Sequence, residues 1–339
     1  MWKALVISGG GYKAVSFLSS LQTIQLTYPN WFKPIQYLVG TSSGSMIAAL
    51  LLIGYSLDEL LYLLEHFPLR HIWKPSIYQL QKGGLNDSQF IEHFMKACFL
   101  QKGISPDLTF LQAQQQFHRS LVCSVFNLNL LQTEFLSPDS TPHLSICKAV
   151  RMSCCFPAVF TPVYHDGYMY IDGGVLDNFP IRYLLEKKEI PKEKILGIAY
   201  WLSKDILMKE KQPEENYQWN FYMERIWSFF QLPTASSFES LHSNDWIVFE
   251  NFSRESTYQF QPEWIEIGKQ KTELFLQNLF FRKKKHYLQS KYFAIWFQKI
   301  NGKDKPLHDR EVQQVHLEPS LPPLLTSEDV QPLHSQIPL

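Results

Sequence analysis

The chain has 339 residues, enough for one large domain or two of moderate size. Its 32 basic and 32 acidic side chains cancel, which argues against nucleic-acid binding, because contacts to phosphates need a surplus of Lys and Arg. Hydrophobic residues make up 45% of the chain, enough for a large core. Glycine is scarce, at 15 residues, so the places where it does occur are informative.

The first part of the chain alternates strands and helices and has no acidic residue before Asp58. Two strands, Lys3–Ser8 and Pro34–Val39, each run into a glycine-rich turn. A helix follows each turn, over Ala14–Thr27 and Ser45–Gly54. This order predicts an α/β fold with a parallel sheet, because parallel strands are joined by crossover helices.

The later elements follow from hydrophobic periodicity and turn residues. Asp166-Gly167 indicates a hairpin turn within Val163–Asp172, and Gly83-Gly84 indicates a loop. The remaining predicted elements are helices over Leu57–Phe67, Ser88–Leu100, His143–Cys154 and Pro180–Lys188, and strands over Ser120–Leu128 and Lys194–Trp201.

Composition divides the chain into three parts. Residues 1–205 carry the α/β pattern and form the predicted main domain. Residues 206–300 are rich in Trp, Phe and Tyr, and we expect a helical extension there. Six of the 20 prolines lie from Gly302 onward, which predicts a disordered tail over residues 301–339.

The cysteine pattern indicates the compartment. Five cysteines without regular spacing suggest neither a disulfide framework nor a zinc site, so we expect no metal and reduced, buried thiols. The longest apolar stretch, Met46–Tyr55, is too short to span a bilayer. The sequence therefore predicts a cytoplasmic protein whose membrane contact, if any, is peripheral.

A candidate nucleophile lies in the pentapeptide Gly40-Thr41-Ser42-Ser43-Gly44, which fits the G-x-S-x-G pattern. A sharp turn between a strand and a helix would expose the Ser42 hydroxyl at the sheet edge, and Gly40 and Gly44 leave room for that turn. An ordinary Gly/Ser turn is the alternative. The strand predicted before the pentapeptide and the helix predicted after it favour a nucleophile.

A second motif, Gly9-Gly10-Gly11, also lies between a strand and a helix. Successive backbone N–H groups in such a turn can bind an anion. A dinucleotide-binding turn needs an acidic residue about twenty positions later, but none precedes Asp58. The other interpretation is an oxyanion hole beside Ser42, because neighbouring parallel strands end at the same sheet edge.

A third motif, Asp172-Gly173-Gly174, closes a strand. A carboxylate followed by two glycines can approach another loop closely, although Asp-Gly turn caps are common. None of the 11 histidines lies beside a comparable motif, and His165, the nearest, is interpreted as a hairpin residue. The residues alone leave the base that would activate Ser42 open.

Taken together, these motifs resemble the patatin-like phospholipase family over about Lys3–Trp201. The resemblance implies a three-layer α/β/α sandwich with a mainly parallel sheet. It also implies that the protein is a serine lipid acyl hydrolase with a Ser-Asp dyad, without a histidine, a metal or another cofactor. The segments that carry the resemblance are Ser8–Lys13, Val39–Gly44, Ala149–Ser153 with Pro157, Phe160 and Pro162, and Asp172–Pro180.

The resemblance also implies a role for each motif. Ser42 would attack a lipid ester, and Asp172 would accept its proton and later activate water. The amides of Gly9, Gly10 and Gly11 would hold the oxyanion, with Lys13 adding positive charge. Gly40, Gly44, Gly173 and Gly174 would support the motifs. The implied partners are a lipid substrate and a transient membrane or micelle surface.

Three positions depart from the family pattern. Ala14 and Ser19 stand where glycine is usual, and Asn127 stands where Asp is frequent. An inactive relative that serves as a lipid-binding or scaffold module is the alternative, although the intact Ser42 and Asp172 argue against it.

One further segment suggests membrane contact. Phe280–Tyr287 (FFRKKKHY) mixes bulky aromatics with a basic run, as interfacial helices do. A solvated basic face on a helix that packs on the core is the alternative interpretation.

Overall fold

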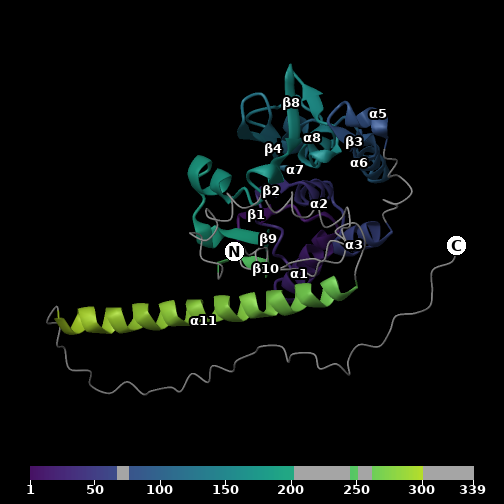
Figure 1. Cartoon of the computed structure of the whole chain (residues 1–339). Coiled ribbons are helices and arrows are strands. Elements are labelled where there is room, and N and C mark those ends of the chain that lie inside the picture. Colours follow the sequence, from purple (N-terminus) through teal and green to yellow (C-terminus); the bar gives the residue numbers. More distant parts are fainter. Residues whose placement is uncertain (67–75, 202–244, 251–261, 301–339) are drawn as a thin grey trace, which may run out of the picture. The chain divides into compact units, whose positions relative to one another are not determined.

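The computed structural model describes residues 1–66, 76–201, 245–250 and 262–300, with side chains up to Arg282 (Figure 1). The chain divides into two compact units, Met1–Lys284 and Lys285–Leu339. The strands of the described residues all lie in the first unit. The tail expected over residues 301–339 lies outside the described residues.

Among the described residues, eight strands form one sheet. Their bounds are β1 Ala4–Ile7, β2 Tyr37–Thr41, β4 Ser120–Asn127, β5 Gln132–Leu136, β7 Val163–His165, β8 Tyr168–Asp172, β9 Ile195–Trp201 and β10 Ile247–Glu250. The order is β10-β9-β1-β2-β4-β8-β7, with β5 also paired to β4. The strands from β10 to β4 are parallel, and the others run antiparallel to their neighbours. The mainly parallel sheet is therefore confirmed.

Helices and a small ribbon complete the described fold (Figure 1). The α-helices are α1 Ala14–Thr27, α2 Ser43–Leu52, α3 Leu57–Glu65, α5 Ile77–Leu80, α6 Gln89–Gln101, α7 Phe110–Phe117, α8 Ile146–Ser153 and α11 Glu263–Ile300. Short 3-10 turns cover Gly11–Lys13, Gly173–Val175 and Lys192–Lys194, and a π-helix covers Tyr183–Lys187. The strands β3 Gly84–Asn86 and β6 Ala158–Phe160 pair in parallel.

Both faces of the parallel strands are buried. Leu5 and Ile7 of β1 belong to a large core that includes α1 and α2. Ala4 and Val6 point to the opposite face, where they join a second core with Tyr183 of the π-helix. Because side chains alternate along a strand, the sheet has packed layers on both sides. The three-layer α/β/α sandwich is confirmed.

The strand expected over Pro34–Val39 lies further along the chain, as β2. Its pairing to β1 begins at Ala4 and Tyr37, while the Ile35 N–H closes a turn onto the Phe32 carbonyl. This register carries β2 on to Thr41, which places Ser42 directly after its last residue.

The extension expected over residues 206–300 is helical in α11 but also contains a strand. β10 pairs in parallel with β9, with Ile247 in one core and Val248 in the other. A strand buried on both faces is a continuous apolar run without alternation, so the sequence did not reveal it. Residues 206–244 and 251–261 lie outside the described residues.

Several smaller elements were also not predicted. They are α5, α7, β5 and the β3–β6 ribbon. At the predicted loop, Gly83 does adopt a left-handed turn conformation, with φ at 93°, but Gly84 already belongs to β3. The hairpin with its turn at Asp166-Gly167 is confirmed.

Candidate active site

The first two glycine turns meet at one edge of the sheet, because β1 and β2 are parallel neighbours with Ile7 opposite Gly40. A Cβ atom added to Gly9 would lie 2.9 Å from the Cβ atom of Ser42. Only a residue without a side chain fits there. The sequence therefore places the Gly9 backbone directly against the candidate nucleophile.

Ser42 forms the sharp turn that the pentapeptide predicted. Its φ is 52° and its ψ is −127°, a conformation that costs a non-glycine residue free energy and often marks functional sites. Helix α2 begins at the next residue, and the Ser45 N–H donates to the Ser42 carbonyl at 2.9 Å. The half-buried Ser42 side chain is thus held where a strand becomes a helix.

Gly40 and Gly44 make this turn possible. A Cβ atom on Gly40 would lie 2.4 Å from the Ser45 nitrogen, and one on Gly44 would lie 2.3 Å from the Ile7 carbonyl oxygen. Both clashes are with backbone atoms, which cannot move aside as a flexible side chain could. The two glycines let the start of α2 pack directly on β1 and β2.

Asp172 ends β8, which runs antiparallel to β4 with Val125 opposite Asp172. The side chain is almost fully buried, at 1% exposure. Its backbone N–H donates to the Cys155 carbonyl at 2.9 Å, and its Oδ1 accepts from the Gly174 N–H at 2.8 Å. The 3-10 turn that begins at Gly173 supplies this second donor.

Burial raises the pKa of Asp172 from 3.8 to about 7, although hydrogen bonding to the Ser42 hydroxyl and the Gly174 N–H lowers it. In the described part of the chain, Oδ2 makes no hydrogen bond of good geometry. The Ser42 hydroxyl is therefore close enough to affect the carboxyl without being aligned on Oδ2. Catalytic hydrogen bonds are often this loose before substrate binds.

The three glycine amides are not equivalent. The Gly9 N–H donates to Asn178 Oδ1 at 3.0 Å, and Asn178 Nδ2 donates back to the Gly9 carbonyl at 3.2 Å. The Gly10 N–H donates to Ser43 Oγ at 3.1 Å. Gly11 is exposed with φ at 57°, and no hydrogen bond of its N–H occurs within the described residues. Gly11 thus offers the open donor, and Gly9 is occupied.

A match to the family described as "Patatin-like phospholipase" covers residues 5–185, more than half of the chain. The chain belongs to the patatin-like phospholipase family.

Individual proteins similar to this chain include two viral proteins. The chain is 32% identical to "Uncharacterized protein R571" of Acanthamoeba polyphaga mimivirus over 53% of this chain and 60% of the relative. It is 31% identical to "Probable lipid hydrolase 463L" of Invertebrate iridescent virus 6 over 53% of this chain and 62% of the relative. The chain thus spans about 60% of the length of these relatives.

A solved structure with a similar fold is VipD from Legionella pneumophila. It aligns with a TM-score of 0.57 and 18% identity, over 82% of this chain and 66% of that chain. At this identity the likeness concerns the fold.

Lys13, which the patatin-like resemblance places near the oxyanion, is buried at 2% exposure. Its ammonium group donates to the Tyr200 hydroxyl at 3.0 Å and lies 4.5 Å from the centre of that ring. Tyr200 belongs to β9, the neighbour of β1 on the side away from Ser42. A charge contribution of Lys13 at the oxyanion stays a prediction.

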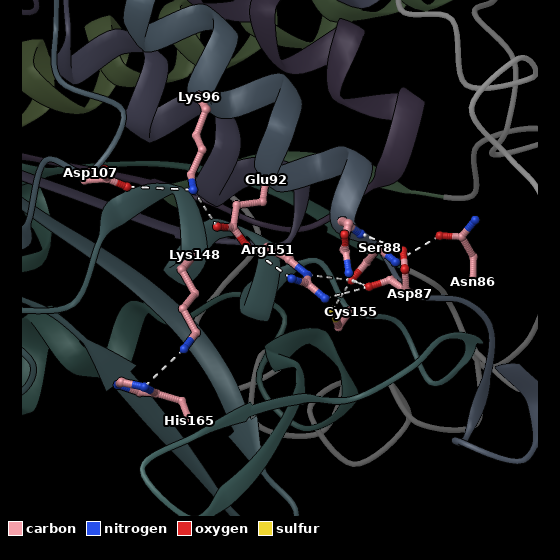
Figure 2. A network of polar contacts seen from close by, with 11 residues as sticks. Asn86, Asp87, Ser88, Glu92, Lys96, Asp107, Lys148, Arg151, Cys155 and His165 are labelled. Carbon is pink, nitrogen blue, oxygen red and sulfur yellow. Dashed lines mark hydrogen bonds and ion pairs between the residues drawn. The ribbon is translucent and has the colours of Figure 1, made fainter.

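His165, the histidine considered as a possible base, lies in the β7–β8 hairpin, as predicted from the sequence. Its Nδ1 is 3.4 Å from Lys148 Nζ (Figure 2). Burial and the nearby Lys148 charge lower the pKa of His165, and the groups that shift the pKa of Asp172 include no histidine.

The departures from the patatin-like pattern have structural explanations. Ala14 is right-handed, with φ at −57°, so no glycine is required there. Ser19 Oγ donates to the Ile265 carbonyl at 2.6 Å and ties α1 to α11. Asn127 Oδ1 accepts from the N–H groups of Asn129 and Leu130 and orders the turn after β4.

Two polar residues that contact the site motifs were not singled out from the sequence. Asn178 holds Gly9, and Ser153 accepts the Ser42 N–H at 2.9 Å. Both lie inside segments that carry the family resemblance, which was the available signal.

Over the described ranges, no three His, Cys, Asp or Glu side chains gather as a metal site would need. No helix there is long and apolar enough to span a bilayer.

Proposed function

We propose that this protein is a serine lipid hydrolase that cleaves carboxylic esters of phospholipids or related lipids through an acyl-enzyme. The observation that carries the proposal is the pairing of Ser42, in its left-handed turn, with the buried Asp172, whose pKa its hydroxyl affects. Membership of the patatin-like family and the viral relative named as a probable lipid hydrolase support the same reaction class.

The reaction follows from the chemistry of these groups. Ser42 Oγ attacks the ester carbonyl carbon while its proton passes to the Asp172 carboxylate. The tetrahedral oxyanion is stabilised by the Gly11 N–H, with the Gly10 N–H joining if it turns away from Ser43. The alcohol leaves with the proton. Asp172 then removes a proton from water, which attacks the acyl-Ser42 ester, and returns that proton to Ser42 Oγ as the fatty acid is released. Because a free Asp is too acidic to be a good base, a pKa near 7 suits this role.

The test uses a serine-reactive fluorophosphonate and a mixture of phospholipids and neutral lipids. We expect covalent labelling that mass spectrometry maps to Ser42, together with release of free fatty acid. If the folded protein binds lipid vesicles but is not labelled and releases no fatty acid, the hydrolase proposal is contradicted. That result would favour the alternative of a lipid-binding module. The lipids that disappear identify the substrate class.

We also propose that α11 brings the protein to anionic lipid surfaces. The buried residues Trp264, Gly268, Thr272 and Phe275 recur on one side of the helix. Phe280 and Phe281 beyond them are exposed. From 274 to 300 the helix has six basic residues and no acidic one, and basic residues among aromatics are typical of helices at anionic interfaces.

Vesicle co-sedimentation tests this surface. Binding to vesicles with phosphatidylserine should exceed binding to phosphatidylcholine vesicles and weaken as salt is raised. Phe280→Ser combined with Phe281→Ser should lower the bound fraction several-fold, because each exposed ring contributes apolar area. Leu26→Ser, an exposed apolar residue on α1, is the control. Equal binding to both vesicle types would refute the proposal.

A further inference from the structure

The end of helix α8 contacts both candidate catalytic residues. Ser153, the last residue of α8, is fully buried. Its Oγ accepts the Ser42 N–H at 2.9 Å and donates to the Ser124 carbonyl at 2.7 Å. Two residues later, the Cys155 carbonyl accepts the Asp172 N–H at 2.9 Å. The nucleophile and the base are therefore both held through their backbone N–H groups by one short segment.

The Ser153 hydroxyl lies where two strands separate. Thr41 of β2 is still paired with Ser124 of β4, but the chain turns sharply at Ser42. The Ser153 hydroxyl bonds to the Ser42 N–H, which follows β2, and to the Ser124 carbonyl of β4. These two backbone groups are not hydrogen-bonded to each other in the sheet. It thus satisfies two backbone groups that would otherwise lose a partner in the protein interior.

We propose that Ser153 is a positioning residue for the nucleophile. Its hydroxyl holds the Ser42 backbone in the left-handed conformation, and this conformation directs the Ser42 hydroxyl toward Asp172. The inference rests on the proposed function, because it concerns the acylation step of the same site. Ser153 acts through the Ser42 backbone N–H and not on the Ser42 hydroxyl itself.

A polar network fixes the helix end from which Ser153 acts (Figure 2). Arg151 donates to Glu92 at 3.2 Å, to Ser88 Oγ at 3.0 Å and to the Asp87 carbonyl at 2.7 Å. Ser88 Oγ also lies 3.0 Å from Cys155 Sγ. These bonds tie α8 to α6 and to the loop after β3. A hydroxyl on an anchored helix end can hold its partner in one place.

The test compares Ser153→Ala with Ser145→Ala. Ser145 precedes the same helix, and its buried Oγ has no hydrogen-bond partner in the described part of the chain, so its loss removes no hydrogen bond. Loss of a buried hydrogen bond should slow the covalent labelling of Ser42 by fluorophosphonate in Ser153→Ala by about 10- to 100-fold. KM for a lipid ester should stay within about threefold, because substrate contacts are unchanged, while Ser145→Ala should behave as the native protein. Ser153→Thr, which keeps the hydroxyl, should recover most of the rate.

Amide hydrogen exchange supplies a readout that needs no turnover. The Ser42 N–H should exchange faster in Ser153→Ala than in Ser145→Ala. If Ser153→Ala does not fold, Ser153→Cys takes its place, since a thiol fills similar volume but is only a weak acceptor. Native labelling rates and unchanged exchange in either folded variant would overturn the inference. If the native protein is not labelled by fluorophosphonate and does not hydrolyse lipid esters, the proposed function fails. Amide hydrogen exchange would still decide whether Ser153 holds the turn.

Discussion

Ser42→Ala should lower kcat/KM for lipid ester hydrolysis by at least about 10⁴-fold, the scale of effect seen when a serine nucleophile is removed. The variant keeps the backbone turn, the Ser42 N–H bond to Ser153 and the first turn of α2, because none of these uses the side-chain hydroxyl. It loses the atom that would form the proposed acyl-enzyme. The measurement is fatty-acid release at saturating and subsaturating substrate, with covalent labelling as a second readout.

The neighbouring Ser43 supplies the matched control. Its hydroxyl accepts the Gly10 N–H, so Ser43→Ala frees an amide of the oxyanion loop but removes no nucleophile. We expect its activity to stay within about tenfold of the native value. If Ser43→Ala abolishes labelling while Ser42→Ala retains it, the assignment of the nucleophile is wrong.

The turn around Ser42 could be predicted because its requirements are local. Gly40 and Gly44 are needed for contacts within a few residues of Ser42 and with the adjacent β1, and the strand and helix that flank them have clear patterns. The candidate base is different. Asp172 lies 130 positions from Ser42 in the sequence, and only the pairing of β8 with β4 brings the two together. From the sequence, only the resemblance to a family predicted that Ser42 and Asp172 lie together.

The hydrogen bonds around the turn could not be predicted from the motifs. All three glycine amides were expected to face an oxyanion, but Asn178, 169 positions away, occupies the Gly9 N–H. Ser153, 111 positions from Ser42, occupies the candidate nucleophile's own amide. Such partners depend on how distant segments pack. β10 was missed for a related reason, since its burial on both faces removes the alternation that reveals a strand.

In the proposed mechanism, the burial of Asp172 would supply the basicity that a histidine supplies in many serine hydrolases. In the described residues the groups that act on the Asp172 pKa are the protein interior, the Ser42 hydroxyl and the Gly174 N–H. The interior disfavours the charged carboxylate and so makes it more basic. The free energy that the fold loses by burying this group is the source of its basicity, so activity and stability should respond oppositely when Asp172 is changed.

Asp172→Asn should lower kcat by about 10²- to 10⁴-fold, because an amide cannot accept the proton of Ser42. The Gly174 N–H can still donate to the amide oxygen, as it now does to Oδ1, so the strand end keeps its structure. In the native protein the rate should rise with pH to a plateau, with a midpoint near 7, because the base must be ionised. The residual rate of the variant should show no such midpoint.

Stability should change with pH in the opposite sense. The pKa of Asp172 is about 7 in the folded protein and near 3.8 when the chain is unfolded. At pH values well below 3.8 both states are protonated, so the ionisation of the carboxyl has no effect on stability. As the pH rises from about 4 to 7, the unfolded state ionises first and native stability falls. The Tm of Asp172→Asn should therefore exceed that of the native protein by an amount that grows over this range and is constant above about pH 7.

Thermal melts at pH 4, 6 and 8 measure the difference in Tm. A variant that is less stable than the native protein at pH 8 would show that the surroundings of the Asp172 carboxylate stabilise it rather than destabilise it by burial.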